Sequence, residues 1–276
     1  MSLADIENAL QFHCKRHVAF DLQFAGQERL LAIDPALFAA YGKDFVDYVQ
    51  VYQETIDSVL PRYVGIIYRT CARRPSDISL LDFGGGTGIL SFLAKLCGIG
   101  FVCYMDFDRN QTEGSRQLAL ALNIPVDDFI TGSYEGIESH CPYCFDVIAD
   151  YDVLEHVYSP EQTFLALKKV LRPGGEICMA SGANTLNPII NILCRRRHKL
   201  WEEIGSPKRR AHLATRRDMI QESFPDLGQP DCEMLAQKTR GLRHSDIIHA
   251  VNLYKDKGII PRPAPGTNTC DPSDGN

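Results

Sequence analysis

The stretch LLDFGGGTG, residues 80–88, decides the fold of this chain. It continues a short apolar run and opens an amphipathic stretch, so it is expected to join a buried strand to a helix. Glycines at positions 84, 86 and 88 let the backbone turn tightly and approach a ligand closely, because no β-carbon stands in the way. With Asp82 at the strand's carboxyl end, the pattern predicts a ligand-binding turn.

The spacing of these glycines separates the candidate ligands. The dinucleotide fingerprint G-x-G-x-x-G fails in every register, and no G-x-x-x-x-G-K-[ST] loop for a nucleoside triphosphate occurs. Asp106 ends the next predicted strand, about twenty residues after the loop, where a carboxylate can accept hydrogen bonds from both hydroxyls of a ribose. A ligand with a ribose but no pyrophosphate fits both observations. Asp108 is a second candidate for the ribose contact.

Short apolar runs alternate with amphipathic stretches after Pro75, which is typical of βαβ units and a mainly parallel sheet. The fold class is therefore α/β. Strands are expected at residues 78–83, 101–106, 128–131, 145–150 and 175–181, and helices at 88–97, 110–122 and 160–171.

The first seventy-odd residues read as helical. Between Tyr41 and Ile67, apolar side chains recur every three or four residues, which places them on one helical face, and Pro61 is expected to kink or restart that helix. The face either packs on the core or forms a lid over a substrate pocket. In the second case, Tyr41 and Tyr48 would form aromatic walls.

Composition and charge exclude several classes of protein. The 276 residues are 45% hydrophobic and 23% charged, as in folded globular domains, and the formal net charge of −6 argues against bulk binding of nucleic acid. The N-terminal residues lack the basic start and apolar run of a signal peptide, and no stretch approaches a membrane span. A cytoplasmic protein is predicted. Its ten scattered cysteines are expected to be reduced.

Four segments together resemble the ordered motifs of class I methyltransferases that use S-adenosylmethionine. They are the glycine turn at 82–88, Asp106, FDVIADYDVLEHV at 145–157 and ALKKVLRPGGEI at 166–177. The segment HLATRRDMIQESFPDLG, from His212, is similar to a histidine-containing segment of the ubiquinone-biosynthesis-like, small-molecule branch. The resemblance covers roughly residues 78–182.

The resemblance implies a Rossmann-like, seven-stranded, mostly parallel sheet with helices on both faces. Together with the helical spacing near the N-terminus and the Pro-, Gly- and polar-rich C-terminus, it predicts an N-terminal helical cap or lid at 1–75, a methyltransferase domain at 76–260 with a cap insertion at about 183–217, and a disordered tail at 261–276. It also implies a cofactor site formed by Asp82, Gly84, Gly85, Gly86, Gly88, Asp106, Phe107, Ser133, Tyr134 and Asp150. Where many relatives carry an acid near the adenine, this chain reads TGSY at 131–134.

The residues after the fourth predicted strand are expected to face the transferred methyl group. His156 is the first candidate for a base or substrate contact, because a neutral imidazole accepts protons near physiological pH. A structural role at a helix start is its alternative. His212, in a segment that would cap the substrate, and Tyr151 complete the predicted catalytic set.

The function predicted from these features is methyl transfer from S-adenosylmethionine to a small molecule, with oxygen as the first acceptor atom, then nitrogen or carbon. The alternatives are a non-catalytic S-adenosylmethionine-binding module that holds a partner protein, and a nicotinamide-dependent oxidoreductase. Motifs of nucleic-acid methylation are missing, since Asp150 is not followed by Pro-Pro and the order at 141–142 is Cys-Pro. No oligomeric state follows from the sequence.

Two further segments carry distinct chemistry. Cys141 and Cys144 have chelating spacing but lack a second ligand pair, so no metal is expected and they are interpreted as thiols. Residues 195–217 hold nine Lys or Arg and two acids. This basic segment either forms a solvated helix face or attracts an anionic substrate, an acidic carrier protein or an anionic membrane surface. Stable insertion into a membrane is not expected.

Overall fold

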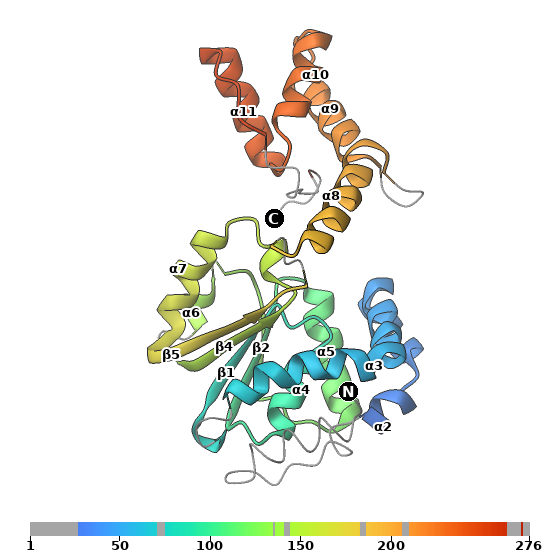
Figure 1. Ribbon diagram of the computed structural model, residues 1–276, viewed down its shortest axis with the longest axis vertical. Helices are drawn as coiled ribbons and strands as arrows, with labels where there is room; N and C mark the ends of the chain where they lie inside the picture. Colours follow the sequence, from blue (N-terminus) through green and yellow to red (C-terminus); the bar gives the residue numbers. More distant parts are fainter. Residues whose placement is uncertain are drawn as a thin grey trace. The chain divides into compact units, whose positions relative to one another are not determined.

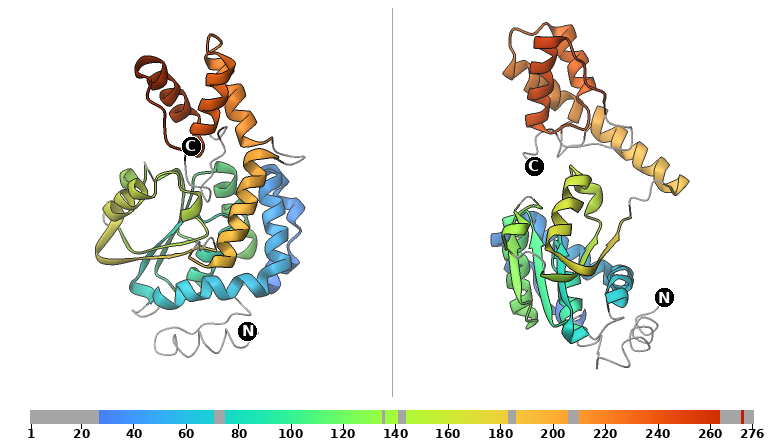
Figure 2. Two further views of the ribbon diagram at one scale, coloured as in Figure 1. Left: turned by 45° about the horizontal axis from the view of Figure 1, so that its top comes forward. Right: turned by 90° about the vertical axis from the view of Figure 1, so that its left-hand side faces the viewer.

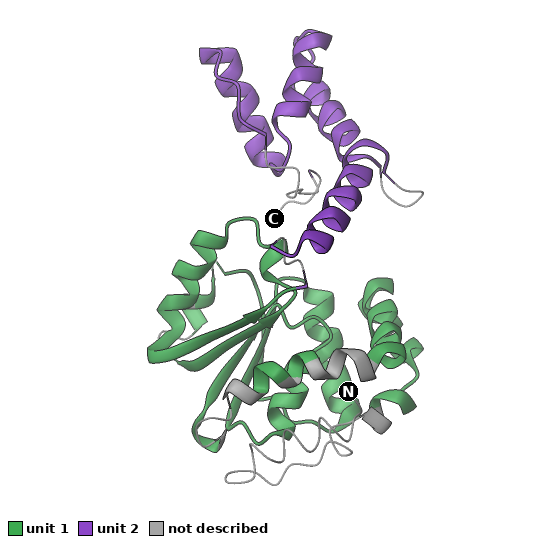
Figure 3. Ribbon diagram, in the orientation of Figure 1, with its two compact units in different colours: residues 1–181 green, residues 182–276 purple. Residues whose placement is uncertain are grey.

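The computed structural model describes residues 27–70, 75–134, 136–140, 144–182, 186–205, 210–263 and 272. Contacts within the chain divide it into two compact units, residues 1–181 and 182–276, shown in green and purple in Figure 3. The sequence instead placed one methyltransferase domain at 76–260, and those domain limits remain a prediction. The two units are described separately below.

The first unit is built on a five-stranded sheet in the order β3-β2-β1-β4-β5, and every pairing is parallel (Figure 1). The strands are β1 Ser79–Phe83, β2 Phe101–Asp106, β3 Asp128–Thr131, β4 Phe145–Tyr151 and β5 Leu171–Ala180. The predicted α/β class and parallel sheet are confirmed. All five predicted strands form, with two of them at the expected bounds.

Helices cover both faces of this sheet, as Figure 2 shows. Successive strand residues point to opposite sides, so Leu80 joins the cluster under α3, α4 and α5, whereas Leu81 joins the cluster under α6 and α7. The elements of this unit besides the strands are α2 Gln27–Ala32, η1 Pro35–Tyr41, α3 Lys43–Thr70, η2 Pro75–Asp77, α4 Ile89–Leu96, α5 Arg109–Leu122, α6 Ile137–His140, η3 Leu154–His156 and α7 Pro160–Val170.

The part of the expected N-terminal cap that the structure describes, residues 27–70, is helical, and its role as a cap or lid remains a prediction. Its long helix α3 buries Phe45, Val49 and Ile67 against the cluster that also holds α4 and α5. Helical assignment continues through Pro61, so the helix does not restart there, and Figure 1 shows that α3 is bent. A proline in a helix interior removes one backbone hydrogen bond and favours such a bend. Residues 1–26 lie outside the described part.

The strand order places the ligand-binding edge. β1 pairs with β2 on one side and with β4 on the other, so the chain's progress across the sheet reverses at β1. In open parallel sheets, ligands bind beyond the carboxyl ends of the strands at such a reversal. Asp82, Asp106 and Asp150 stand at or next to the carboxyl ends of β1, β2 and β4.

Every element of secondary structure in the described part of the second unit is a helix. It contains α8 Pro188–Glu203, α9 His212–Ser223, α10 Gln229–Lys238 and α11 His244–Lys257. The expectation of seven strands is therefore not confirmed. The apolar residues here follow helical spacing, as with Ile247, Ala250 and Val251, which are all buried. Of the predicted tail, only residues 261–263 and 272 are described.

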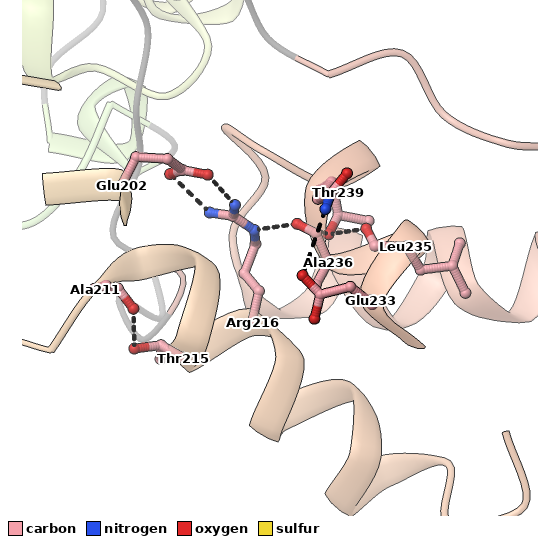
Figure 4. A network of polar contacts seen from close by, with 9 residues as sticks. Glu202, Ala211, Thr215, Arg216, Glu233, Leu235, Ala236 and Thr239 are labelled. Carbon is pink, nitrogen blue, oxygen red and sulfur yellow. Dashed lines mark hydrogen bonds and ion pairs between the residues drawn. The ribbon is translucent and has the colours of Figure 1, made fainter. Parts of the chain in front are cut away.

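A buried arginine joins three helices of the second unit (Figure 4). The Arg216 side chain is fully buried, and its guanidinium pairs with the Glu202 carboxylate of α8. Its Nε donates a hydrogen bond of 2.8 Å to the carbonyl oxygen of Ala236 in α10. The basic segment therefore contains at least one structural charge, because Arg216 faces the interior of this unit.

Candidate functional site

The carboxyl group of Asp82 lies buried at the carboxyl end of β1. Its Oδ2 accepts hydrogen bonds from the backbone N–H of Ser91, at 3.0 Å, and from the Ser91 hydroxyl, at 2.7 Å. Burial raises the pKa of Asp82 to about 7, and the two hydrogen bonds from Ser91 oppose that rise. The group anchors the start of α4 and places a titratable carboxyl beneath the glycine turn.

The glycine turn is held close to its neighbours. A β-carbon at Gly88 would stand 2.2 Å from the Ser115 hydroxyl, and its φ of +89° belongs to the left-handed region that favours glycine. Gly86 also has a positive φ, +52°, but a β-carbon there would meet nothing within 4 Å. The turn is therefore packed tightly at Gly88 and open at Gly86.

The carboxylate of Asp106 ties the turn to the end of β2. Its Oδ2 accepts the backbone N–H of Gly86 at 3.0 Å, and its Oδ1 accepts the N–H of Asp108 at 2.9 Å. The Tyr104 hydroxyl donates to the carbonyl oxygen of Gly86 at 2.6 Å. Each carboxylate oxygen retains acceptor capacity for a ligand hydroxyl. Asp108, the second candidate for the ribose contact, caps α5 by accepting the N–H of Asn110 at 2.8 Å.

Asp150 is the one carboxyl at this edge that the folded chain leaves unsatisfied. The side chain is fully buried, and neither oxygen has a hydrogen-bond partner within the described residues. Burial raises the pKa of Asp150 to about 7, and the negative charge of Asp82 adds to that effect. A buried polar group without a partner is costly, so these oxygens are suited to a positively charged or hydrogen-bond-donating ligand.

Three tyrosines meet above the strand ends. The hydroxyls of Tyr52 and Tyr63, both on α3, lie 3.0 Å apart, and the ring centroids of Tyr63 and Tyr151 are 5.1 Å apart. Arg62 donates a hydrogen bond of 3.0 Å to the Tyr151 hydroxyl. Burial raises the pKa of Tyr63, so its phenol stays protonated. α3 thus brings an aromatic and hydroxyl-bearing surface to the end of β4.

Tyr52 and Tyr63 were missed as site residues. The expected aromatic walls were Tyr41 and Tyr48, but Tyr41 packs against the Phe45 ring, and Tyr48 is 54% exposed. A usable signal was present, because eleven residues separate Tyr52 from Tyr63 and three helical turns return a side chain to the same face.

The remaining predicted cofactor residues, Phe107, Ser133 and Tyr134, differ in how much of each is exposed. Phe107 follows β2 and is 64% exposed, so its ring face is available to a flat ligand. Ser133 is exposed in the loop after β3, and Tyr134 is half-buried against the α6 and α7 side of the sheet. The contacts of these three residues with a cofactor stay predictions.

The predicted histidines do not share one place in the fold. His156 ends η3 and is exposed, a few residues beyond Tyr151. Between them, Asp152 has a φ of +57°, uncommon for a residue with a β-carbon. His212 starts α9 in the second unit and is buried. Only Tyr151 and His156 thus belong to the described β4 edge.

The expectation for the cysteines needs one correction. Cys144, just before β4, is disulfide-bonded rather than a free thiol. The five other described cysteines form no disulfide bond: Cys97, Cys103, Cys178, Cys194 and Cys232. Cys141, the other half of the Cys-x-x-Cys pair, lies outside the described residues. Among described residues, no three metal-ligating side chains form a group that could hold a metal ion.

A family model described as "Methyltransferase domain" matches residues 75–222, more than half of the chain. The chain belongs to this methyltransferase family. The chain is a class I, S-adenosylmethionine-dependent methyltransferase, and the match includes the glycine turn and all three strand-end carboxyls.

Curated relatives of this methyltransferase act on different acceptors, according to their names. A ribosomal protein L11 methyltransferase from Burkholderia thailandensis is 28% identical over 143 residues, covering 49% of this chain and 44% of the relative. A ubiquinone biosynthesis O-methyltransferase from Saccharophagus degradans is 34% identical over 98 residues, covering 36% and 41%. The chain thus spans less than half the length of these relatives.

Solved structures show a more distant likeness. The PH0226 protein from Pyrococcus horikoshii OT3 is 24% identical, with a TM-score of 0.41, and the match covers 51% of this chain and 63% of that one. Within the described residues, no helix combines the length and apolar character needed to cross a membrane.

The site fits S-adenosylmethionine on its own geometry. The turn leaves open space at Gly86, and the adjacent Asp106 carboxylate has acceptor capacity for ribose hydroxyls. The unpartnered, buried Asp150 carboxyl suits a ligand that carries positive charge, and this cofactor carries both a sulfonium and an ammonium group. The missing pyrophosphate fingerprint agrees with a nucleoside that lacks a diphosphate.

Proposed function

We propose that this protein transfers a methyl group from S-adenosylmethionine to a small-molecule acceptor, with oxygen as the first acceptor atom, then nitrogen or carbon. One observation carries the proposal. The fully buried Asp150 carboxyl has no partner within the described chain and stands beside the glycine turn, at the edge where Asp82 and Asp106 also lie. That arrangement leaves a site for a cationic nucleoside.

In this proposal, the carboxyl groups at the strand ends bind different parts of the cofactor. Asp106 would bind the ribose hydroxyls while it holds Gly86 through the backbone N–H. Asp82 and Asp150 would balance the positive charge of the cofactor, because a nearby cation favours the ionised form of a buried carboxyl. Contacts to the adenine are assigned to Phe107, Ser133 and Tyr134, and the backbone of Gly84, Gly85, Gly86 and Gly88 would line the cofactor.

In this proposal, the acceptor lies against the tyrosines of α3 and β4. When bound, S-adenosylmethionine supplies an electrophilic methyl group. Tyr63 and Tyr151 would exclude water from the acceptor, and the hydrogen bond from Arg62 holds the Tyr151 hydroxyl in place. A hydroxyl acceptor must lose its proton, and the exposed His156 is the proposed proton acceptor in a closed complex. His212 keeps its proposed role in substrate contact.

Support for a small acceptor comes from the site rather than from the relatives. The relatives include a methyltransferase named for a ribosomal protein and one named for ubiquinone biosynthesis, so their names point to both acceptor classes. The aromatic surface formed by the half-buried Tyr52 and Tyr151 beside the buried Tyr63 suits an aromatic small molecule better than an extended chain. The non-catalytic module is the second candidate.

Labelled methyl transfer tests the proposal. The full chain is incubated with tritiated S-adenosylmethionine and a panel of phenolic and carboxylated small molecules, and with a protein extract in parallel. We expect label in the small-molecule fraction and a larger loss of turnover than of cofactor affinity for His156→Ala. Label in the protein fraction alone would contradict the small acceptor. The absence of label from every acceptor, with cofactor bound, would favour the non-catalytic module.

A further inference from the structure

Helix α8 forms on its own local signals and is joined to the rest of the second unit at one end. Asn187 caps its first turn by accepting the N–H of Ile189 at 3.0 Å, and Pro188 occupies the first helical position. Near its C-terminal end, Glu202 is buried against Arg216. Figure 3 shows α8 as a long helix that projects from the other helices of this unit.

The apolar residues of α8 do not take part in a core. The hydrophobic cluster of the second unit draws on α9, α10 and α11 and their adjoining loops. No residue of α8 belongs to any hydrophobic cluster of the described chain. The helix nevertheless carries large aliphatic side chains, which the core of this unit does not bury.

Four aliphatic side chains on one side of α8 and its C-cap are here named the α8 stripe: Ile189, Leu193, Leu200 and Ile204. Their spacings of four, seven and four residues return to the same side of a helix with 3.6 residues per turn. All four are between 51% and 71% exposed. Leu186, just before the helix, is 92% exposed and extends the apolar surface.

Basic side chains border the α8 stripe on both sides. Arg196 and Arg197 lie three and four residues from Leu193, so they flank the stripe on opposite sides of its centre. Arg195 and Lys199 are also exposed. Of the two acids on the helix, Glu202 is buried in its pair with Arg216, which leaves Glu203 as the one acid on the outer face.

We propose that the α8 stripe binds the surface of an anionic lipid bilayer, with the helix lying in the plane of the interface. Aliphatic side chains enter the boundary between headgroups and acyl chains, and flanking arginines reach anionic headgroups on either side. The chemistry favours lipid over a protein groove, because basic residues border the stripe on both flanks in a chain whose net charge is −6. The helix lies on the bilayer and does not cross it.

Vesicle co-sedimentation with the full chain tests this proposal. The probes are vesicles of phosphatidylcholine alone and of phosphatidylcholine mixed with phosphatidylglycerol. We expect binding to the anionic vesicles only, weakened at high salt. Leu193→Ser is expected to reduce the partition constant by about tenfold, since a buried leucine contributes strongly to transfer from water. Arg196→Gln is expected to reduce it by about fivefold.

A matched control separates the stripe from surface hydrophobicity in general. Leu120 on α5 is 68% exposed and lies in the first unit, so Leu120→Ser should leave vesicle binding unchanged. Absence of binding, equal binding to both vesicle types, or an equal loss in Leu120→Ser would overturn the proposal. So would a larger fall in melting temperature for Leu193→Ser than for Leu120→Ser in lipid-free buffer, or an oligomer that Leu193→Ser dissociates, because serine is the poorer helix former at both positions and any excess would show that protein covers the stripe.

Discussion

At the level of single residues, buried carboxyl groups at one sheet edge lower the stability of the folded chain. Asp82 and Asp150 are both buried, and burial raises the pKa of each to about 7. Their proximity adds repulsion when both are ionised. Natural proteins retain such arrangements mainly at functional sites, where a ligand supplies the missing charge.

Replacing Asp150 with asparagine should separate cofactor binding from stability. The variant loses a charge that would face the cofactor's cations, so affinity for S-adenosylmethionine should fall by about 1.5–3 kcal/mol. Without ligand at pH 8, it should unfold at a higher denaturant concentration, because a buried ionised carboxylate has been removed. Calorimetric titration and urea unfolding measure the two effects. Unchanged affinity would place the cofactor's charge elsewhere.

The same carboxyls set a dependence of stability on pH. Because their folded pKa of about 7 exceeds the ordinary aspartate pKa of 3.8, the folded chain binds protons more tightly than the unfolded chain. Their contribution is therefore fully present below pH 3.8 and is lost as pH rises to about 7. The difference in unfolding free energy between wild type and Asp150→Asn should follow this trend. A difference that is flat across that interval would contradict it.

At the level of secondary-structure elements, the turn between β1 and α4 requires glycine for two reasons: its left-handed backbone conformation and the lack of room for a β-carbon. At Gly88 both apply, since its φ is +89° and the Ser115 hydroxyl occupies the position of a β-carbon. At Gly174, in β5, φ is +78° but the space is open. The two positions allow backbone strain to be separated from steric overlap.

Gly88→Ala should destabilise the first unit by about 2–4 kcal/mol, the sum of left-handed strain and overlap. Gly174→Ala should cost only the strain, about 1–2 kcal/mol. Thermal unfolding followed by circular dichroism measures both. Equal losses in the two variants would mean that contact with Ser115 does not restrict the turn.

Strand and helix positions in the first unit were largely predictable, because parallel strands buried on both faces leave short apolar runs between glycine and proline signals. The strand-end carboxyls Asp82, Asp106 and Asp150 followed from the same pattern. The contact between Tyr63 and Tyr151 could not be predicted from that pattern, because it depends on how α3 packs over β4. Burial of Asp150 without a partner also required the packed structure.

At the scale of the whole molecule, the chain combines a parallel α/β unit with a helical unit. The sequence predicted seven strands from a resemblance, whereas the described residues beyond 180 form helices. The helical spacing of apolar residues beyond residue 182 favours helices there, whereas the family resemblance covers roughly residues 78–182. A cytoplasmic location and the absence of a nucleic-acid partner remain predictions.

The helical unit should depend strongly on its buried ion pair. Arg216→Met leaves the Glu202 carboxylate buried without a partner and should cost about 3–5 kcal/mol. The double variant Arg216→Met with Glu202→Leu should recover most of that loss, because no charge remains buried. Trp201 on α8 is the single tryptophan, so its fluorescence reports unfolding of this unit. A double variant as unstable as the single one would show that the pair is not the cause.

The edge formed by Asp82, the glycine turn, Asp106 and Asp150 is proposed to bind S-adenosylmethionine. Calorimetric titration of the full chain with S-adenosylhomocysteine, with NAD as the control ligand, tests this assignment. The expected result is saturable binding of S-adenosylhomocysteine alone, weakened by about 1–3 kcal/mol in Asp106→Ala, which loses hydrogen bonds to the ribose. Binding of NAD, or of neither ligand by the folded protein, would contradict the assignment of this site.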